Sequence, residues 1–338
     1  MLLTSSHAET GREEAERVFQ SSEHVHQALT NVGYITDAVT ATAVYLAASL
    51  QKPLLLEGPA GSGKTELAYA VARAADTHLE RLQCYEGITE EKAIGKFDEG
   101  LQRLYLDTVT RGSGASDWAS LGKQLSALDF FAAGPLLKAL QYPSPCVLLI
   151  DELDKVDHSF EATLLEVLSV WRLSIPRLGT ITASSVPFTV LTSNQERRLG
   201  DPIRRRSLYV RVEHPTPERE GEIVARRTPE AGTPAHWLIA GFAKALRAYS
   251  LEKPPSISEM IDVALSLQHL GIQEVTSEHR DMLLPLLAKT ERDRQRLLLR
   301  DGFASIIHAA RHYAESMESS EIDAMLAGPA LLAKGAAV

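Results

Sequence analysis

Short uninterrupted runs of apolar residues alternate along the chain with segments whose apolar residues recur at helical spacing. The apolar runs occupy residues 54–56, 146–150 and the stretch that ends at 190–192, and two further strands, interrupted by polar residues, are plausible at 79–84 and 208–212. A parallel strand covered on both faces shows no alternation of apolar and polar side chains, so these runs predict buried strands. Helical spacing is clear over residues 35–50 and 64–75. This order predicts an α/β fold, a doubly wound parallel sheet with helices on both faces.

The same pattern divides the chain into three parts. Residues 1–33 are polar, lack a sustained apolar period, and are predicted to form a loose N-terminal tail. The predicted strands all lie within residues 34–214, which we assign to the α/β domain. Residues 215–338 hold no convincing strand and only helical patterns, such as those over 261–267 and 297–310. We therefore expect a small all-helical lid domain with a C-terminal tail.

Two segments are less clearly patterned. A short helix is predicted over residues 13–19 of the tail, to which we assign no function. Residues 86–141 mix helical segments around a loop rich in glycine and serine at 111–116.

The composition narrows the class of protein. With 338 residues, of which 44% are hydrophobic, the chain can bury a full core. The net charge of −9 gives no overall attraction to nucleic acid or to an anionic membrane, although it leaves room for a local basic patch. The two cysteines, Cys84 and Cys146, are far apart and are expected to be buried free thiols in a reducing compartment.

Neither a secretory signal nor a membrane span is expected. Residues 1–20 carry four glutamates and no apolar core. The most apolar stretch, residues 38–50, is too short to cross a bilayer. We therefore expect a cytoplasmic protein.

A glycine-rich motif follows the first predicted strand. Residues 58–65 match G-x-x-x-x-G-K-[ST] between a predicted strand and a predicted helix, the context in which this motif binds phosphate. Backbone N–H groups and the helix N-terminus would hold the phosphates, Lys64 would reach the β- and γ-phosphates, and the Thr65 hydroxyl would take a Mg²⁺ position. The alternative is a chance glycine-rich turn before a helix. We assign ATP binding to Gly58, Pro59, Ala60, Gly61, Ser62, Gly63, Lys64, Thr65, Glu66 and Asp151.

Two carboxylates, Asp151 and Glu152, follow the most apolar predicted strand, at the end where open α/β sheets bind ligands. Asp151 would hold Mg²⁺ together with Thr65, and Glu152 would act as general base on the attacking water. Asn194 ends the next apolar run and would orient that water. The alternatives are an acidic strand-to-helix turn and a turn-forming asparagine.

A cluster of arginines at residues 204–206 precedes the last predicted strand. Guanidinium groups at this place suit a finger inserted into a neighbouring subunit's site, where a planar cation neutralises charge on the γ-phosphate. A solvated charge run and a nucleic-acid patch are the alternatives.

The order of these motifs resembles the AAA+ superfamily and, within it, the MoxR family, with the greatest similarity to the CoxD-like subgroup. The similar segments are residues 54–68, 149–155, 164–168, 175–181, 191–194 and 201–209, within roughly residues 33–267. The phosphate loop is generic, whereas Ile-Pro-Arg-Leu-Gly-Thr-Ile at 175–181 and Arg-Arg-Arg-Ser-Leu-Tyr at 204–209 are far more particular.

The resemblance implies an AAA+ core that hydrolyses ATP to ADP and phosphate, with Mg²⁺, in a hexameric ring of like subunits. It also implies a chaperone that remodels or matures a protein client, alongside a partner with a von Willebrand factor A domain. The CoxD-like subgroup is associated with the metal centre of molybdenum hydroxylases such as carbon monoxide dehydrogenase. The trans-acting finger falls on Arg206, with Arg205 next, and the insert within residues 86–141 would face a central pore.

Other functions stay open at this point. A DNA-directed AAA+ motor is opposed by the acidic balance and by the lack of an appended reading module. A nucleotide-gated assembly switch with little turnover is favoured by residues 253–260, where the second-sensor arginine of many AAA+ proteins has no counterpart and Lys253 is the candidate substitute. His308 and His312 have a helical spacing that zinc can use, but no third ligand is evident.

Overall fold

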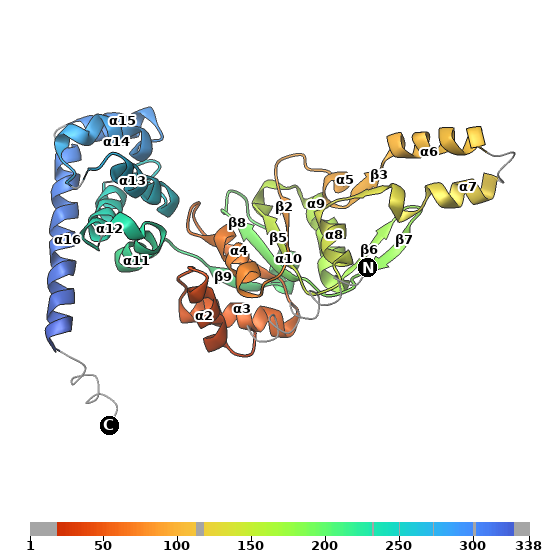
Figure 1. The fold of residues 1–338 in the computed structure, drawn as a ribbon, viewed down its shortest axis with the longest axis horizontal. Helices are drawn as coiled ribbons and strands as arrows, with labels where there is room; N and C mark the ends of the chain where they lie inside the picture. The colour runs from red at the N-terminus through yellow and green to blue at the C-terminus, as the bar shows by residue number, and fades with distance from the viewer. Residues whose placement is uncertain are drawn as a thin grey trace, which may run out of the picture. The chain divides into compact units, whose positions relative to one another are not determined.

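The computed structural model describes residues 19–112, 118–231, 233–249, 251–272, 274–299 and 302–327. The chain divides into two compact units, and Figure 1 labels most of their helices and strands. The first unit takes the residues up to 212 apart from 60–62, and the second takes 60–62 together with the residues from 213 onward.

A five-stranded parallel sheet forms the centre of the first unit (Figure 1). Its strands are β1 (Leu54–Glu57), β2 (Leu79–Gln83), β5 (Val147–Asp151), β8 (Phe188–Ser193) and β9 (Leu208–Arg211). They lie in the order β2-β5-β8-β1-β9, and each neighbouring pair is parallel. Every residue of β1 and β5 is buried, which is why these strands read as apolar runs in the sequence. The predicted parallel sheet is confirmed.

Helices cover both faces of this sheet. One face carries α2 (Ser22–Asn31), α3 (Ala38–Leu50) and α4 (Lys64–Ala74), and the other carries α8 (Pro135–Gln141), α9 (His158–Val170) and α10 (Asp201–Arg206). Side chains of a strand point alternately to opposite faces. Leu54 and Leu56 of β1 accordingly belong to the core under the first group of helices, and Leu55 belongs to the core under the second. The predicted doubly wound arrangement is confirmed.

Helix α2 lies where the sequence analysis predicted a loose polar tail. The Ser21 hydroxyl accepts a backbone N–H bond at 3.2 Å and caps the helix. Val25 and Leu29, one turn apart, are buried in the core shared with α3 and α4. Two buried apolar side chains give too weak a period to predict a helix, and packing on the sheet supplies the stability that the local pattern lacks.

The described residues between β2 and β5 form an insert with its own helices and strands. It contains α5 (Glu90–Ala93), β3 (Gly95–Phe97), α6 (Glu99–Gly112), α7 (Trp118–Leu125), the 3₁₀ helix η1 (Leu128–Phe130), β4 (Phe131–Ala133) and α8. Strands β3 and β4 pair antiparallel, with Phe97 opposite Phe131. The loop predicted at 111–116 begins inside α6, and residues 113–117 lie outside the described part of the chain, as does the predicted helix over 13–19 apart from Phe19.

A β-hairpin between α9 and β8 was not predicted. Strands β6 (Arg172–Ile175) and β7 (Gly179–Thr182) pair with each other and not with the five-stranded sheet. The Leu178 N–H donates to the Ile175 carbonyl at 3.1 Å, closing a turn in which Arg177 has a φ of 71°. Only alternate residues of β6 are buried, so the segment lacks the unbroken apolar run of the core strands.

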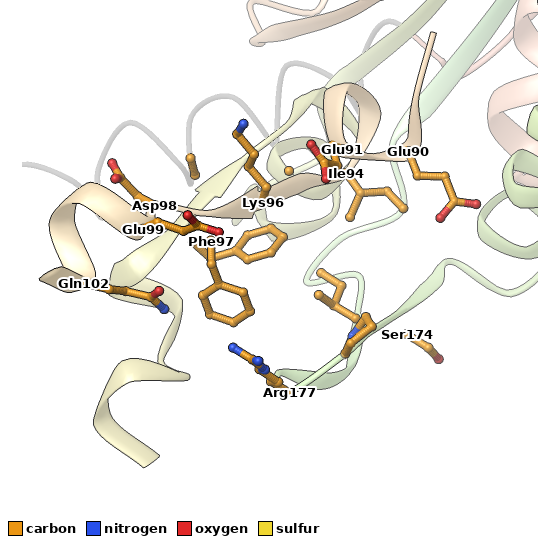
Figure 2. A pocket seen from close by; sticks show the side chains of 15 residues that line it. Glu90, Glu91, Ile94, Lys96, Phe97, Asp98, Glu99, Gln102, Ser174 and Arg177 are labelled. Carbon is orange, nitrogen blue, oxygen red and sulfur yellow. The ribbon is translucent and has the colours of Figure 1, made fainter. Parts of the chain in front are cut away.

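A cavity of about 800 Å³ lies between the β3–β4 pair and this hairpin (Figure 2). The Phe97 and Phe131 rings form an apolar part of its wall, and the carboxylate of Glu99 comes from the start of α6. The Arg177 guanidinium lies over the Phe97 ring, 5.9 Å from its centroid. The insert and the hairpin therefore make one surface feature, and its lining does not include the glycine-rich loop.

The second unit is helical. Its helices are α11 (Pro217–Arg227), α12 (Thr233–Ala248), α13 (Ile257–His269), α14 (Arg280–Leu287), α15 (Glu291–Leu298) and α16 (Gly302–Ala327), with the 3₁₀ turns η3 (Pro229–Ala231) and η4 (Ser277–His279). The rings of Phe242 and Phe303 pack edge to face in its core, with their centroids 5.9 Å apart. No strand occurs among the described residues of this unit, as predicted. The helical pattern over 297–310 spans two helices, because α15 ends before α16 begins at Gly302.

Three smaller expectations can be compared with the structure. Cys84 and Cys146 are buried free thiols, as predicted, at opposite ends of the parallel β2–β5 pair. His308 and His312 are exposed on α16, and the described residues hold no group of three or more His, Cys, Asp or Glu side chains that could hold a metal ion. No helix in the described part of the chain is long and apolar enough to cross a membrane.

Candidate functional site

The glycine-rich loop, residues 58–63, joins β1 to α4. At Gly58 a Cβ atom would lie 1.9 Å from the carbonyl oxygen of Val212, so a side chain has no room beside the end of β9. Gly61 and Gly63 have φ values of 72° and 91°, in the left-handed region that favours glycine. The loop then passes directly into α4, so it has the backbone path of a phosphate-binding loop before a helix N-terminus.

Lys64, the first residue of α4, folds back on the loop. Its ammonium group donates hydrogen bonds to the carbonyl oxygens of Gly58 at 2.9 Å and Pro59 at 2.7 Å. Burial lowers the pKa of Lys64, and the carboxylates at and just after the end of β5 partly oppose that shift. The carboxylate of Glu66, in the same helical turn, pairs with Arg73 at 2.8 Å. Lys64 is thus the cation of the loop.

Asp151 connects the acidic strand to the loop helix. Its Oδ1 accepts hydrogen bonds from the hydroxyl groups of Thr65 at 2.9 Å and Thr192 at 2.6 Å, and its side chain is 4% exposed. Mg²⁺ prefers oxygen ligands and takes one or two from the protein while keeping waters and phosphate oxygens. The structure therefore brings together the two predicted metal ligands, and their oxygen atoms fit Mg²⁺.

Glu152, which leads from β5 into the 3₁₀ turn η2 (Leu153–Lys155), is held by its backbone and by its side chain. Its φ of 56° and ψ of 48° are left-handed, a conformation that costs a non-glycine residue roughly 1 kcal/mol or more and that concentrates at functional sites. Its N–H donates to the Thr192 hydroxyl at 2.9 Å. Its Oε2 accepts a hydrogen bond from the Gln83 side chain at 3.1 Å and pairs with Lys155 at 3.0 Å. The carboxylate is one-third exposed, so water can reach it.

Arg81, Gln83 and Thr192 complete the site, and the sequence analysis missed all three. Arg81 lies 2.6 Å from Oδ2 of Asp151 and also donates to the Gln83 side chain. Burial alone would lower the pKa of Arg81, but the hydrogen bond and charge of Asp151 outweigh it and raise that pKa. For Arg81 and Gln83 the sequence signal was a pair of polar residues two apart in β2, which becomes informative once Gln83 is known to lie opposite Asp151 in the sheet.

Asn194 directly follows β8, the strand between β5 and β1. Its backbone N–H donates to Oδ2 of Asp154 at 3.1 Å, and the N–H of Glu196 donates to the same oxygen at 2.9 Å. Asp154 is 3% exposed, so a buried carboxylate ties the loop after β8 to the turn after β5. Asn194 is thereby held at the same edge of the sheet as Asp151 and Glu152.

The three arginines of α10 have different surroundings. Arg204 lies 2.6 Å from Oε1 of Glu57, the last residue of β1, whose side chain is 1% exposed. Arg205 and Arg206 are exposed, and the guanidinium of Arg206 donates a long hydrogen bond, 3.3 Å, to the carbonyl oxygen of Pro202 in its own helix. Arg204 is therefore fixed inside its own domain, and the two arginines that the sequence analysis selected are accessible from outside.

Comparison with known proteins places most of this site within one family match. Residues 53–207 match the family described as "AAA domain (dynein-related subfamily)". This segment runs from the start of β1 to the end of α10 and contains the loop, the acidic pair, Asn194 and the arginines.

The curated relatives carry less information. Uncharacterised proteins of Staphylococcus aureus strains USA300 and NCTC 8325 are each 26% identical over 152 residues, which is 45% of this chain and 49% of theirs. The chain thus spans about half the length of the curated relatives that it matches. Among solved structures, a mutant of RuvB from Thermotoga maritima aligns with 15% identity and a TM-score of 0.36, over 78% of this chain and 75% of that one.

Proposed function

We propose, on the premise that residues 53–207 have the AAA+ P-loop NTPase fold, that this chain binds ATP with Mg²⁺ and hydrolyses it to ADP and phosphate. The observation that carries the proposal is the contact of Thr65 with Asp151, beside the held carboxylate of Glu152. Phosphoryl transfer depends on holding the phosphates, the metal ion and the attacking water in place, and this contact brings α4, which follows the glycine-rich loop, to the carboxylates at the end of β5.

Each residue has a role in this proposal. The amide groups of the glycine-rich loop and the ammonium group of Lys64 bind the phosphates. Thr65 and Asp151 supply oxygen ligands to Mg²⁺, which when bound neutralises charge on the β- and γ-phosphates. Glu152 accepts a proton from the attacking water. Asn194, at the end of the neighbouring strand, orients that water.

A complete site would need a second subunit. The exposed Arg205 and Arg206 are the cations available to reach a neighbour's γ-phosphate, since Arg204 is bound to Glu57 of its own domain. We infer a ring of like subunits, hexameric by its resemblance to MoxR proteins. Its work would be to remodel or mature a protein client, with a von Willebrand factor A domain protein as partner and a molybdenum hydroxylase such as carbon monoxide dehydrogenase as the candidate client.

The test is ATP hydrolysis together with particle mass by light scattering, on the purified chain with ATP and Mg²⁺. We expect Glu152→Gln to bind ATP and to lose nearly all turnover, whereas Glu166→Gln, an exposed carboxylate on α9, keeps it. We expect Arg206→Ala to assemble normally and to lose roughly 10³-fold in turnover. The matched control is Arg198→Ala, whose side chain is 81% exposed. Equal turnover in the wild type and Glu152→Gln would contradict hydrolysis by this site.

One observation favours a second function, a nucleotide-gated assembly switch with little turnover. Glu152 is engaged by both Gln83 and Lys155, and these contacts compete with a water molecule for its carboxylate. If the chain is such a switch, ATP binding would change the particle mass of the wild type in light scattering. Its rate of ATP hydrolysis would then be no higher than that of Glu152→Gln.

A further inference from the structure

The side chain of Arg81 occupies a place at the site that no step of the proposed reaction uses. Its guanidinium lies 2.6 Å from Oδ2 of Asp151, while Oδ1 of the same carboxylate receives the hydroxyl groups of Thr65 and Thr192. Asp151 is 4% exposed, whereas Arg81 is 42% exposed. A buried carboxylate is thus paired with a cation that can reach water.

The position of Arg81 in the sheet makes it movable. Strand β2 is an edge strand, with β5 as its only neighbour among the described strands. A long arginine side chain on an edge strand that is 42% exposed can turn into solvent with little loss of apolar packing, giving up its polar contacts with Asp151, Gln83 and Tyr69. Asp151 has no such freedom, since its carboxylate is fixed on Oδ1 by two hydroxyl groups.

We propose that Arg81 holds the place of Mg²⁺ at Asp151: the guanidinium pairs with this carboxylate when the divalent ion is not bound, and releases it when the ion binds. An uncompensated buried carboxylate is strongly unfavourable, so one cation or the other is required. Two cations at one carboxylate repel each other, so the two compete. This inference rests on the proposed function only in taking Asp151 to face Mg²⁺.

The same guanidinium reaches the general base through one further residue. Arg81 donates to the oxygen of the Gln83 side chain, and the nitrogen of that side chain donates to Glu152. Release of Asp151 by Arg81 therefore also loosens the amide that engages Glu152. Arg81 is in this sense a positioning residue, because it acts on Glu152 only through Gln83.

The test measures the binding of a fluorescent ADP analogue as a function of Mg²⁺ concentration, so that it does not depend on hydrolysis. We expect Arg81→Gln, which removes the competing cation, to lower the Mg²⁺ midpoint about tenfold, equal to about 1.4 kcal/mol. We also expect it to lower the unfolding temperature in EDTA, with the difference from wild type disappearing in excess Mg²⁺ and nucleotide. Arg172→Gln, an exposed arginine on β6, controls for the loss of one positive charge.

An unchanged or raised midpoint in Arg81→Gln would overturn the proposal, because Arg81 would then support Asp151 in both states. If that variant does not fold, Arg81→Lys decides in its place. Lysine keeps the charge but cannot span both Asp151 and Gln83, so it should compete with Mg²⁺ less well than arginine does. We therefore expect a Mg²⁺ midpoint below that of the wild type, but not as low as the tenfold reduction expected when the competing cation is removed. A midpoint no lower than wild type refutes the proposal there too. Failure of the proposed function is distinguishable, since the wild type itself would then show no Mg²⁺-dependent nucleotide binding.

Discussion

Replacement of Arg204 by alanine should destabilise the first unit far more than replacement of either neighbouring arginine. The Glu57 side chain is only 1% exposed, and the change removes the cation that pairs with its carboxylate. The printed side-chain contact that remains is the hydrogen bond from the Gln195 amide to Oε2, at 3.2 Å. Breaking a buried ion pair costs about 3–5 kcal/mol, and the 30% exposure of Arg204 lets water screen part of this, so we expect about 3 kcal/mol. For a domain of this size, that loss lowers the unfolding temperature by roughly 6–12 °C.

The assay is thermal unfolding followed by circular dichroism, in parallel with ATP turnover. Arg205→Ala and Arg206→Ala change exposed side chains and should each alter the free energy of unfolding by less than about 0.5 kcal/mol. They should affect turnover instead. Glu57→Gln combined with Arg204→Ala should be more stable than Arg204→Ala alone, by about 1–3 kcal/mol, because a neutral amide needs no cation. The reasoning is refuted if Arg204→Ala is no less stable than Arg205→Ala.

Four further predictions concern buried groups. Burial raises the pKa of Cys84 and of Cys146 from 9.0 to about 12, so at pH 8 iodoacetamide should alkylate them about 10³-fold more slowly in the native protein than in urea. Because the folded-state pKa is the higher one, these thiols should also make stability fall as pH rises above about 9, measurable by urea unfolding. Gly58→Ala should abolish nucleotide binding in a fluorescence titration, because its Cβ would overlap a carbonyl oxygen, whereas Gly122→Ala, which meets nothing within 4 Å, should bind normally. Asp154→Ala should cost about 2–4 kcal/mol in urea unfolding, because it leaves two N–H groups after β8 without their acceptor.

The core of the fold was predictable because its strands are buried on both faces. Burial of every residue in β1 and β5 produces apolar runs that stand out without an alignment, and the glycine-rich loop and acidic pair follow those runs directly. Helix α2 was not predictable in this way, since it depends on two side chains that find their partners in α3 and α4. The β6–β7 hairpin was missed because its strands are short, with only alternate residues of β6 buried and none of β7.

The contacts around the acidic pair show why the site was only partly predictable. Thr65 and Asp151 belong to motifs that are visible along the chain. Arg81 and Gln83 belong to no such motif, and their importance arises from the register that sets Gln83 opposite Asp151. Register across a parallel pair depends on segments far apart in sequence, so a single sequence does not supply it. The difference between Arg204 and the two exposed arginines beside it was likewise not predictable, because Arg204 pairs with Glu57, which is distant in the chain.

The two small β-sheets indicate where this chain can change length. Among the described residues, the five core strands pair only with one another. Neither the β3–β4 pair nor the β6–β7 hairpin therefore pairs with a strand of the sheet that positions the glycine-rich loop and the acidic pair. Exposed turns of this kind accept added sequence more readily than core connections do. A fluorescent domain inserted into the turn at residues 176–178 should therefore leave the register of β5 and β8 unaltered. Such an insertion would label the protein for fluorescence measurements without changing the core sheet.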